Sequence, residues 1–266
     1  MSEILELPVL QSVPQASVGL RSAAVQALQQ GHVLLFPQLD FATGADEQRA
    51  MSAKVSESDK NISFDPARGV LRGSIATPAD QQTLADMLRR HGDSTITLLD
   101  GLFPGCKTGR HQGRTSFRPA EIAGRVSSGR KDDSRMHVDS FPSSPTQGRR
   151  ILRVFTNVSP NGQSRHWRLG EPFEAAAKRF LPQLPAPPPG LAALLHKLGI
   201  IKSRRSACDH CMLELHDGMK ADVRYRADVA QIAHTFASHC SWMVYTDQAS
   251  HAAMAGQFCS GADLDR

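Results

Sequence analysis

Several features that the 266-residue sequence lacks limit the kind of protein that it can be. No uninterrupted apolar run approaches the roughly 20 residues that a membrane-spanning helix needs. The start, MSEILELPVL, has no basic segment followed by an apolar core and a cleavage site, which predicts that the protein is not exported. No repeat of solenoid period is visible. We therefore expect a globular cytoplasmic protein without a transmembrane segment.

Cysteine is scarce as well. Its five positions are an odd number scattered along the chain, which does not indicate a secreted disulfide framework, so reduced thiols are expected. Cys208 and Cys211 form a C-x-x-C pair. Because no second such pair and no suitably spaced histidine pair accompanies them, we interpret them as two ordinary thiols and not as a zinc site.

The charge balance points to an anionic partner. The formal net charge is +5 and the pI is near 9.1, and many of the 31 lysines and arginines cluster between Lys107 and Arg168. Nucleic acid, anionic lipid and acidic sugars all fit this composition. The alternative is a basic surface that is merely solvated. The apolar fraction of 40% and charged fraction of 21% are those of an ordinary soluble domain.

The pattern of apolar residues changes along the chain. Helical spacing over 17–30 precedes a short strand, HVLLFP, and a second helix, DQQTLADMLRR, is expected to stop at His91-Gly92 before another helical segment, TITLLDGLF. From about Arg135 short β-like runs dominate, namely SRMHVDSF, RRILRVFTNV, SRHWRLG and CSWMVYTD, with helical stretches at EPFEAAAKRF and LAALLHKLG. We predict one α+β domain over 1–266, helix-rich over 1–130, with a β-sandwich or barrel core over 131–266.

One pair of residues in these runs suggests a metal site. Strand alternation places His137 and Asp139 on one face. Two histidines and one carboxylate on one face of Fe(II) leave positions open for a cosubstrate and dioxygen, as in the facial-triad oxygenases. The tripeptide is not specific by itself, because His91-Gly92-Asp93 is a second match. We interpret that second match as residues of a helix end and turn.

A third ligand has to come from a distant segment. His251 follows a strand-like run after a short turn and lies 251 minus 139, or 112, residues beyond Asp139. That separation suits a jelly roll, whose paired strands bring distant segments together. Other histidines compete for this role, namely His210, His216, His234 and His239.

Longer segments carry a resemblance to a known family. KNISFDP, RTSFRP, RKDDSRMHVDSFPS, GRRILRVFTNVSPNGQSRHWRLGEPFE and TDQASHAAMAGQF resemble the 3-deoxy-D-manno-oct-2-ulosonic acid (Kdo) hydroxylases over about Gln30 to Phe258. The resemblance implies a double-stranded β-helix (jelly roll) with helical additions and dependence on Fe(II), 2-oxoglutarate and dioxygen. It implies hydroxylation of carbon 3 of the Kdo sugar of Kdo-lipid A. His137, Asp139 and His251 match the family's iron ligands.

The sequence departs from that family in three places. Cys208-Asp209-His210-Cys211 stands where a Tyr-Asp-His run is expected, and His234 and His239 are additional histidines. The end, CSGADLDR, has little strand propensity where family members continue with another strand. We therefore predict a missing strand, an unpaired sheet edge and weak support for His251. An inactive sugar- or lipid-binding relic is the alternative function.

Arginines are the candidates for binding the cosubstrate and the sugar. A 2-oxoglutarate carboxylate needs a cation, and alternation puts Arg153 and Asn157 on one strand face, with Arg168 as a second candidate. A buried salt bridge with Glu171 or Glu174 is the alternative role for both arginines. The expected partner is Kdo-lipid A, bound transiently at the inner membrane surface, with no nucleic acid. The residues suited to its anions are Arg114, Arg118, Arg130 and Lys131, which could equally be a solvated basic face.

Overall fold

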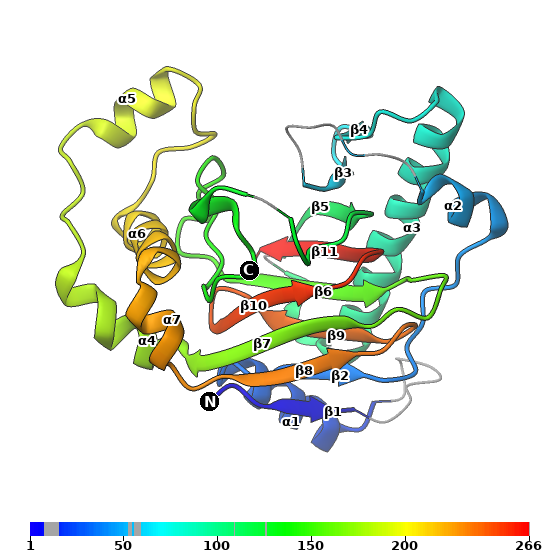
Figure 1. The fold of residues 1–266 in the computed structure, drawn as a ribbon, viewed down its shortest axis with the longest axis horizontal. Helices are drawn as coiled ribbons and strands as arrows, with labels where there is room; N and C mark the ends of the chain where they lie inside the picture. Colours follow the sequence, from blue (N-terminus) through cyan, green and yellow to red (C-terminus); the bar gives the residue numbers. More distant parts are fainter. Residues whose placement is uncertain (8–15, 53–54, 56–59, 109, 126, 266) are drawn as a thin grey trace.

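The computed structural model describes residues 1–7, 16–52, 55, 60–108, 110–125 and 127–265, and it is an α+β fold built on two facing β-sheets (Figure 1). The strands are β1 (Ile4–Glu6), β2 (Val33–Phe36), β3 (Ile62–Asp65), β4 (Val70–Arg72), β5 (His111–Arg118), β6 (Ile151–Asn157), β7 (Arg165–Pro172), β8 (Ile232–Phe236), β9 (Ser241–Tyr245), β10 (Ala249–Ala255) and β11 (Cys259–Asp265). The helices are α1 (Val18–Gln29), α2 (Ala45–Ala50), α3 (Pro78–Leu102), α4 (Phe173–Phe180), α5 (Leu191–Lys197), α6 (Ala207–Ala221) and α7 (Val223–Asp228). Short 3-10 helices lie at Pro104–Cys106, Gly129–Lys131 and Leu181–Gln183.

The two sheets form the predicted jelly roll. The larger sheet has the strand order β1-β2-β9-β6-β11-β5-β3-β4, and the smaller one has the order β10-β7-β8. Their facing sides share an apolar cluster that includes Trp167 and Phe236 from the smaller sheet and Trp242 and Val244 from the larger one. Distant segments therefore meet between the sheets, as this architecture requires.

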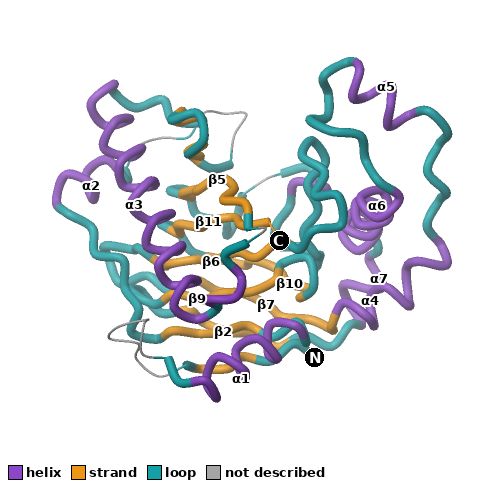
Figure 2. Tube along the Cα trace, turned by 180° about the vertical axis from the view of Figure 1, so that it is seen from behind, coloured by secondary structure: helices purple, strands orange, loops and turns teal. Residues whose placement is uncertain are grey.

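Helices cover the outer face of the larger sheet. Figure 2 shows α1 and α3 lying across that face. In β2 every residue is buried, because Leu34 and Phe36 pack under these helices while Val33 and Leu35 point between the sheets. Helices α4, α6 and α7 pack instead on the side of β10, around Met136, Val138 and Ala252. Among the described residues, no helix is both long and apolar enough to cross a bilayer.

The predicted stop at His91-Gly92 is wrong, because α3 runs through it from Pro78 to Leu102. His91 is buried, and its Nε2 lies 3.1 Å from Oγ1 of Thr156 on the larger sheet. Gly92 lies so close to β5 that a Cβ atom there would stand 2.7 Å from the side-chain nitrogen of Gln112. The glycine thus permits close packing of the helix on the sheet and does not end the helix.

The prediction of a missing strand at CSGADLDR is also wrong. Residues 259–265 of this run form β11, which pairs with β5 on one side and with β6 on the other. Small residues suit this central position, since a Cβ atom on Gly261 would lie 3.1 Å from the ring of Phe155. Pairing along both edges compensates for low intrinsic strand propensity, which is a weak guide in the middle of a sheet.

Two other expectations need adjustment. Strands β1 to β5 belong to the larger sheet, so the part expected to be helix-rich supplies five of its eight strands. The run SRMHVDSF is not a regular strand, because His137 makes only an isolated antiparallel bridge with His251. The strands expected in HVLLFP, RRILRVFTNV, SRHWRLG and CSWMVYTD are confirmed as β2, β6, β7 and β9. The helices expected over 17–30, in EPFEAAAKRF and in LAALLHKLG are confirmed as α1, α4 and α5.

Candidate active site

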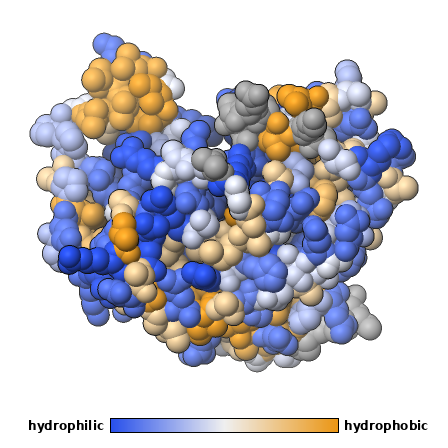
Figure 3. Space-filling view, viewed as in Figure 1, coloured by the Kyte–Doolittle hydropathy of each residue, from blue (hydrophilic) through white to orange (hydrophobic). Residues whose placement is uncertain are grey.

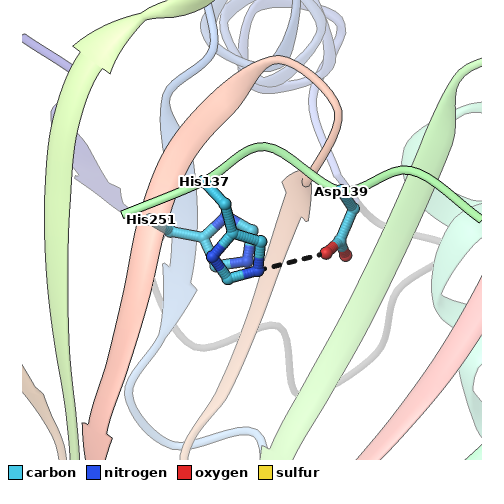
Figure 4. A group of neighbouring side chains, drawn as sticks. All are labelled: His137, Asp139 and His251. Carbon is cyan, nitrogen blue, oxygen red and sulfur yellow. Dashed lines mark ion pairs between the residues drawn. The ribbon is translucent and has the colours of Figure 1, made fainter. Parts of the chain in front are cut away.

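The isolated bridge between His137 and His251 brings the candidate ligands together. The backbone N–H of each residue donates to the carbonyl of the other, at 3.0 and 2.8 Å. Neighbouring side chains alternate, so Met136, Val138 and Ala252 pack under the helices while both imidazoles point the other way. Their ring centroids lie 4.7 Å apart, and Asp139 joins them from the segment that carries His137 (Figure 4).

Local hydrogen bonds determine which nitrogen of each imidazole is free. Nδ1 of His137 lies 2.7 Å from the carbonyl oxygen of Arg135, and Nδ1 of His251 lies 2.9 Å from that of Ala249. A carbonyl oxygen can only accept, so both Nδ1 atoms carry the proton and both Nε2 atoms keep a lone pair. Burial lowers the pKa of His137 to about 4 and also lowers that of His251, so both rings are neutral near pH 7. Neutral imidazoles oriented in this way are metal ligands.

Asp139 supplies the third candidate ligand. Its backbone N–H donates to the carbonyl of Thr246 at 2.8 Å, which ties the segment to the turn before β10. Burial alone raises the pKa of its carboxyl, but the charge of Arg153 holds that pKa well below its usual value. Oδ1 lies 3.5 Å from Nε2 of His137, the contact that the dashed line marks in Figure 4. One ligand atom from each of the three residues can lie within 4.8 Å of the others.

Arg153 contacts this group and is paired with two carboxylates. Its Nη1 donates to Oδ2 of Asp139 at 2.8 Å and its Nε donates to Oδ1 of Asp263 at 2.7 Å. The two carboxylates raise the pKa of Arg153 despite its burial. Arg153 lies on the inward strand face that the sequence predicted, but its guanidinium is already paired with the carboxylates of Asp139 and Asp263.

Aromatic rings pack around the histidines. Trp167 stacks on His251 with ring centroids 5.0 Å apart, and His216 from α6 meets His137 edge-on at 5.3 Å. Phe155 and Trp167 form part of the wall of a cavity of about 320 Å³, which the three candidate ligands also line. The cavity is large enough for small organic molecules, and one end of it is the candidate metal group.

Cations gather at the side of the cavity around one buried carboxylate. Asp133 lies 2.8 Å from Lys60, 2.8 Å from Arg118 and 3.8 Å from Lys220. These charges keep the pKa of Asp133 low even though burial raises it, and burial lowers the pKa of Lys60 and Lys220. Three cations sharing one carboxylate leave a net positive charge, which attracts an anion.

Arg165 is a further cation in the cavity wall. Its Nη1 donates to the carbonyl of Gly256 at 2.9 Å, while its buried Nε has no hydrogen-bond partner among the described residues. Burial lowers its pKa to about 10, so it stays charged near neutral pH. No carboxylate of the described chain forms an ion pair with it. A buried cation in this state is a candidate anion-binding group.

Some of the residues predicted to bind the cosubstrate or the sugar line the cavity and others do not. Arg118 lines the cavity, and Arg130 and Lys131 lie at its mouth, where the Arg130 side chain is 81% exposed and pairs with Asp217. Arg114 lies outside the cavity lining and is 4.0 Å from Asp65. Two predictions for the cosubstrate site are not supported, those for Arg168 and Asn157.

The reasons for these two failures are geometric. Arg168 is on the exposed face of β7, opposite the buried face that carries Arg165 and Trp167, because alternation sends its side chain away from the cavity. The side-chain amide of Asn157 donates to backbone carbonyls of Gln163 and Phe236, and its oxygen accepts from Ser159. Asn157 therefore holds strand ends together.

The competing histidines lie in other environments. His216 lines the cavity without joining the ligand group, His210 contacts the carbonyl of Pro185, His239 pairs with Asp40, and His234 packs on Phe236. Cys208 and Cys211 lie on α6 without a disulfide. His251 is thus the distant histidine that the fold brings to His137 and Asp139.

Sequence reasoning missed three cations of the cavity wall, namely Lys60, Arg165 and Lys220. For Arg165 a signal was available, because the alternation of β7 that places Trp167 inside also places Arg165 inside. Lys60 and Lys220 gave no such signal, since they come from a loop and a helix that only tertiary packing brings to the cavity.

The fold and this site define a class of protein. Two free Nε2 atoms and one carboxylate, on one side of a cavity within a jelly roll, fit Fe(II) held by a facial triad. Such a triad leaves the cavity side of the metal open for other ligands, which is the arrangement of the non-haem iron oxygenases.

Comparisons with known proteins identify the family. The model of the 3-deoxy-D-manno-oct-2-ulosonic acid (Kdo) hydroxylase family matches residues 13–262, and the chain belongs to this family. It is 42% identical to the Kdo hydroxylase KdoO, a non-haem Fe(II) alpha-ketoglutarate-dependent dioxygenase in complex with cobalt(II), with a TM-score of 0.94 over 98% of this chain and 88% of that one. The KdoO complex with alpha-ketoglutarate and Fe(III) gives 41% identity and a TM-score of 0.93 over 99% and 89%. No curated protein matches the chain.

Proposed function

We propose that this protein uses Fe(II), 2-oxoglutarate and dioxygen to hydroxylate carbon 3 of the Kdo sugar of Kdo-lipid A. The observation that carries the proposal is the pair of imidazoles whose Nδ1 atoms are occupied by backbone carbonyls, so that two Nε2 atoms and Asp139 face one cationic cavity. Membership of the Kdo hydroxylase family supports the same reaction.

In this proposal His137, Asp139 and His251 hold the iron. The metal, with 2-oxoglutarate and dioxygen, supplies the oxidising power when bound. The protein positions the reactants: Arg153 keeps Asp139 ionised and oriented, and the walls formed by Phe155 and Trp167 exclude water from the reacting centre. All three ligands come from 131–266, whereas Lys60 and Arg118 enter the cavity from 1–130, which supports a single domain.

We assign the distal carboxylate of 2-oxoglutarate to Arg165 in place of Arg153. Arg165 has no carboxylate partner among the described residues, whereas Arg153 has two. Arg165 and Trp167 lie on the same buried face of β7, one strand repeat or about 6.6 Å apart. Trp167 in turn stacks on His251. An extended five-carbon diacid that reaches from the iron past Trp167 would meet the Arg165 guanidinium.

The carboxylate of the sugar has a separate candidate site at Asp133. Lys60, Arg118 and Lys220 surround this aspartate and carry more positive charge than it neutralises. Arg130 and Lys131 at the mouth are suited to further anionic groups of a glycolipid that extends out of the cavity. We propose that the enzyme meets this substrate in the cytoplasm, at the inner membrane surface.

The alternative, an inactive relic, depended on the strand thought to be missing at the end of the jelly roll. That strand is present as β11, in the centre of the larger sheet. The catalytic interpretation is therefore the better supported one.

Anaerobic addition of Fe(II) and then 2-oxoglutarate tests the proposal. We expect the weak visible metal-to-ligand charge-transfer band in the protein and its absence in the Asp139→Ala variant. On admission of air, succinate release should depend on Kdo-lipid A. If the charge-transfer band forms but succinate release does not depend on Kdo-lipid A, the assignment of the iron site stands and the proposed substrate is wrong.

A further inference from the structure

Helix α5 carries an exposed apolar surface that the proposed reaction does not use. Leu191, Leu194, Leu198 and Ile200, called here the α5 surface, are 39%, 52%, 62% and 56% exposed. Figure 3 shows an apolar patch at one corner of the molecule, and Figure 1 places α5 at that corner, away from both sheets. Each residue of α5 is at least partly exposed. Clustered large apolar side chains on a protruding helix indicate a contact surface.

The segment that carries this surface has charges of one sign. Between Glu174 and Asp209 lie 34 residues (209 − 174 − 1) without any Asp or Glu. The same stretch contains six basic residues. Lys197, Lys202, Arg204 and Arg205 lie at the end of α5 or just after it, whereas Lys178 and Arg179 belong to α4, which Figure 1 places apart from α5. Asp209 at its end is buried, and its carboxylate accepts from the backbone N–H groups of Thr146 and Gln147, so its charge is directed inward. Apolar residues flanked only by cations match a surface that is both apolar and anionic.

The connection after α5 ties this surface to the metal ligands. Ile201 is buried, the N–H of Lys202 donates to the carbonyl of Ser143 at 3.0 Å, and Arg205 donates to the carbonyl of Pro142 at 2.6 Å. Pro142 and Ser143 follow Asp139 by three and four residues and Pro142 lines the cavity. The α5 surface therefore has a defined position relative to the cavity.

We propose that the α5 surface docks the protein onto an anionic lipid bilayer, with Leu194 and Leu198 entering the interface and the neighbouring lysines and arginines meeting lipid phosphates. This inference rests on the proposed glycolipid substrate, which would then be met within the bilayer. Leu194 lies in α5 and Leu198 is its C-cap, four residues later. The N–H of Leu198 donates to the carbonyl of Leu194 at 3.0 Å, so the two residues lie on the same side of the helix, as an interfacial helix requires. A second copy of the chain is disfavoured as the occupant, because it would bring the same cations beside α5, namely Lys197, Lys202, Arg204 and Arg205, into the contact.

Vesicle sedimentation of the whole protein, without substrate, tests the docking. We expect binding to vesicles of phosphatidylglycerol and phosphatidylcholine that exceeds binding to phosphatidylcholine alone. Leu194→Ser with Leu198→Ser should weaken binding about tenfold or more. Lys197→Gln and Lys202→Gln should weaken it by about fivefold for each charge removed. The matched control is Val18→Ser with Val223→Ser, which changes two valines that are 82% and 68% exposed outside α5 and should leave binding unchanged.

Three results would overturn the docking proposal. These are the absence of vesicle binding at low salt, equal loss in the valine control, and a wild-type dimer in sedimentation velocity that Leu194→Ser with Leu198→Ser converts to a monomer. Succinate formation with detergent-dispersed Kdo-lipid A measures the proposed function separately. If the serine variants lose vesicle binding but keep that activity, docking and catalysis are both supported. If the wild type lacks that activity yet binds vesicles, only the proposed substrate fails.

Discussion

Nη1 of Arg153 donates to Oδ2 of Asp139 at 2.8 Å, so a buried guanidinium positions the carboxylate of the candidate metal group. Because Asp263 pairs with the other side of the same guanidinium, the arginine is held in place from β11. This relationship connects strand β11 to the candidate metal site and explains why a strongly polar cluster is tolerated between apolar sheets.

We expect Arg153→Ala to weaken metal binding about 10- to 100-fold, the usual effect of removing a group that orients a ligand. Titration with Co(II), followed by its visible absorption, measures this. Arg153→Lys should restore part of the affinity, because a lysine can still pair with one carboxylate. Unchanged metal affinity together with a raised KM for 2-oxoglutarate would return the cosubstrate role to Arg153.

Removing a candidate ligand should abolish iron-dependent turnover and leave the fold largely intact. His137→Ala and Asp139→Ala remove side chains at a cavity wall, so the loss of packing is small. The second H-x-D match supplies a control, since His91→Ala should keep metal binding but lower stability by about 1–3 kcal/mol through loss of a buried polar contact. Retained turnover in both ligand variants would contradict the assignment of the triad.

For the cosubstrate, Arg165→Ala should raise the KM for 2-oxoglutarate roughly 30-fold or more. Loss of a buried charge-assisted pair typically costs about 2–5 kcal/mol. Arg168→Ala is the matched control on the same strand, because its exposed side chain points away from the cavity. Equal effects of the two substitutions on KM would disprove the assignment of Arg165.

Stability should rise with pH between about 4 and 6.5. Burial lowers the pKa of His91 to about 4, so between that value and 6.5 the unfolded chain binds more protons at this residue than the folded chain does. The destabilisation is complete below pH 4 and can reach about 3 kcal/mol for this one residue. Urea unfolding at pH 4.5 and pH 7 should show a smaller difference for His91→Leu than for the wild type. An equal difference would exclude His91 as a source.

Strand β11 should be among the best protected parts of the chain in hydrogen exchange. Its backbone is paired along both edges, with β5 and β6. Gly261→Val should destabilise the protein by about 1–3 kcal/mol, because the added side chain meets the ring of Phe155 in a packed sheet. Rapid exchange over Cys259–Asp265 would show that the strand is dispensable, as the sequence pattern had suggested.

The sequence by itself determined the ligand motif and several regular elements. His137, Asp139 and His251 could be named because the chemistry needs those residue types and because long segments resemble one family. Strands β6, β7 and β9 have alternating or continuous apolar patterns that depend on local periodicity, which a single sequence displays directly.

Tertiary structure decided everything that depends on which partner a segment meets. Gly92 and Gly261 are signals for a break when read locally, yet each permits a close approach to a neighbouring strand or ring. Arg153 and Arg165 both lie on inward strand faces, and only their partners distinguish them. Asp139 and Asp263 neutralise Arg153, whereas Arg165 has no carboxylate partner among the described residues. Such pairings join residues far apart in the chain, so no local pattern encodes them.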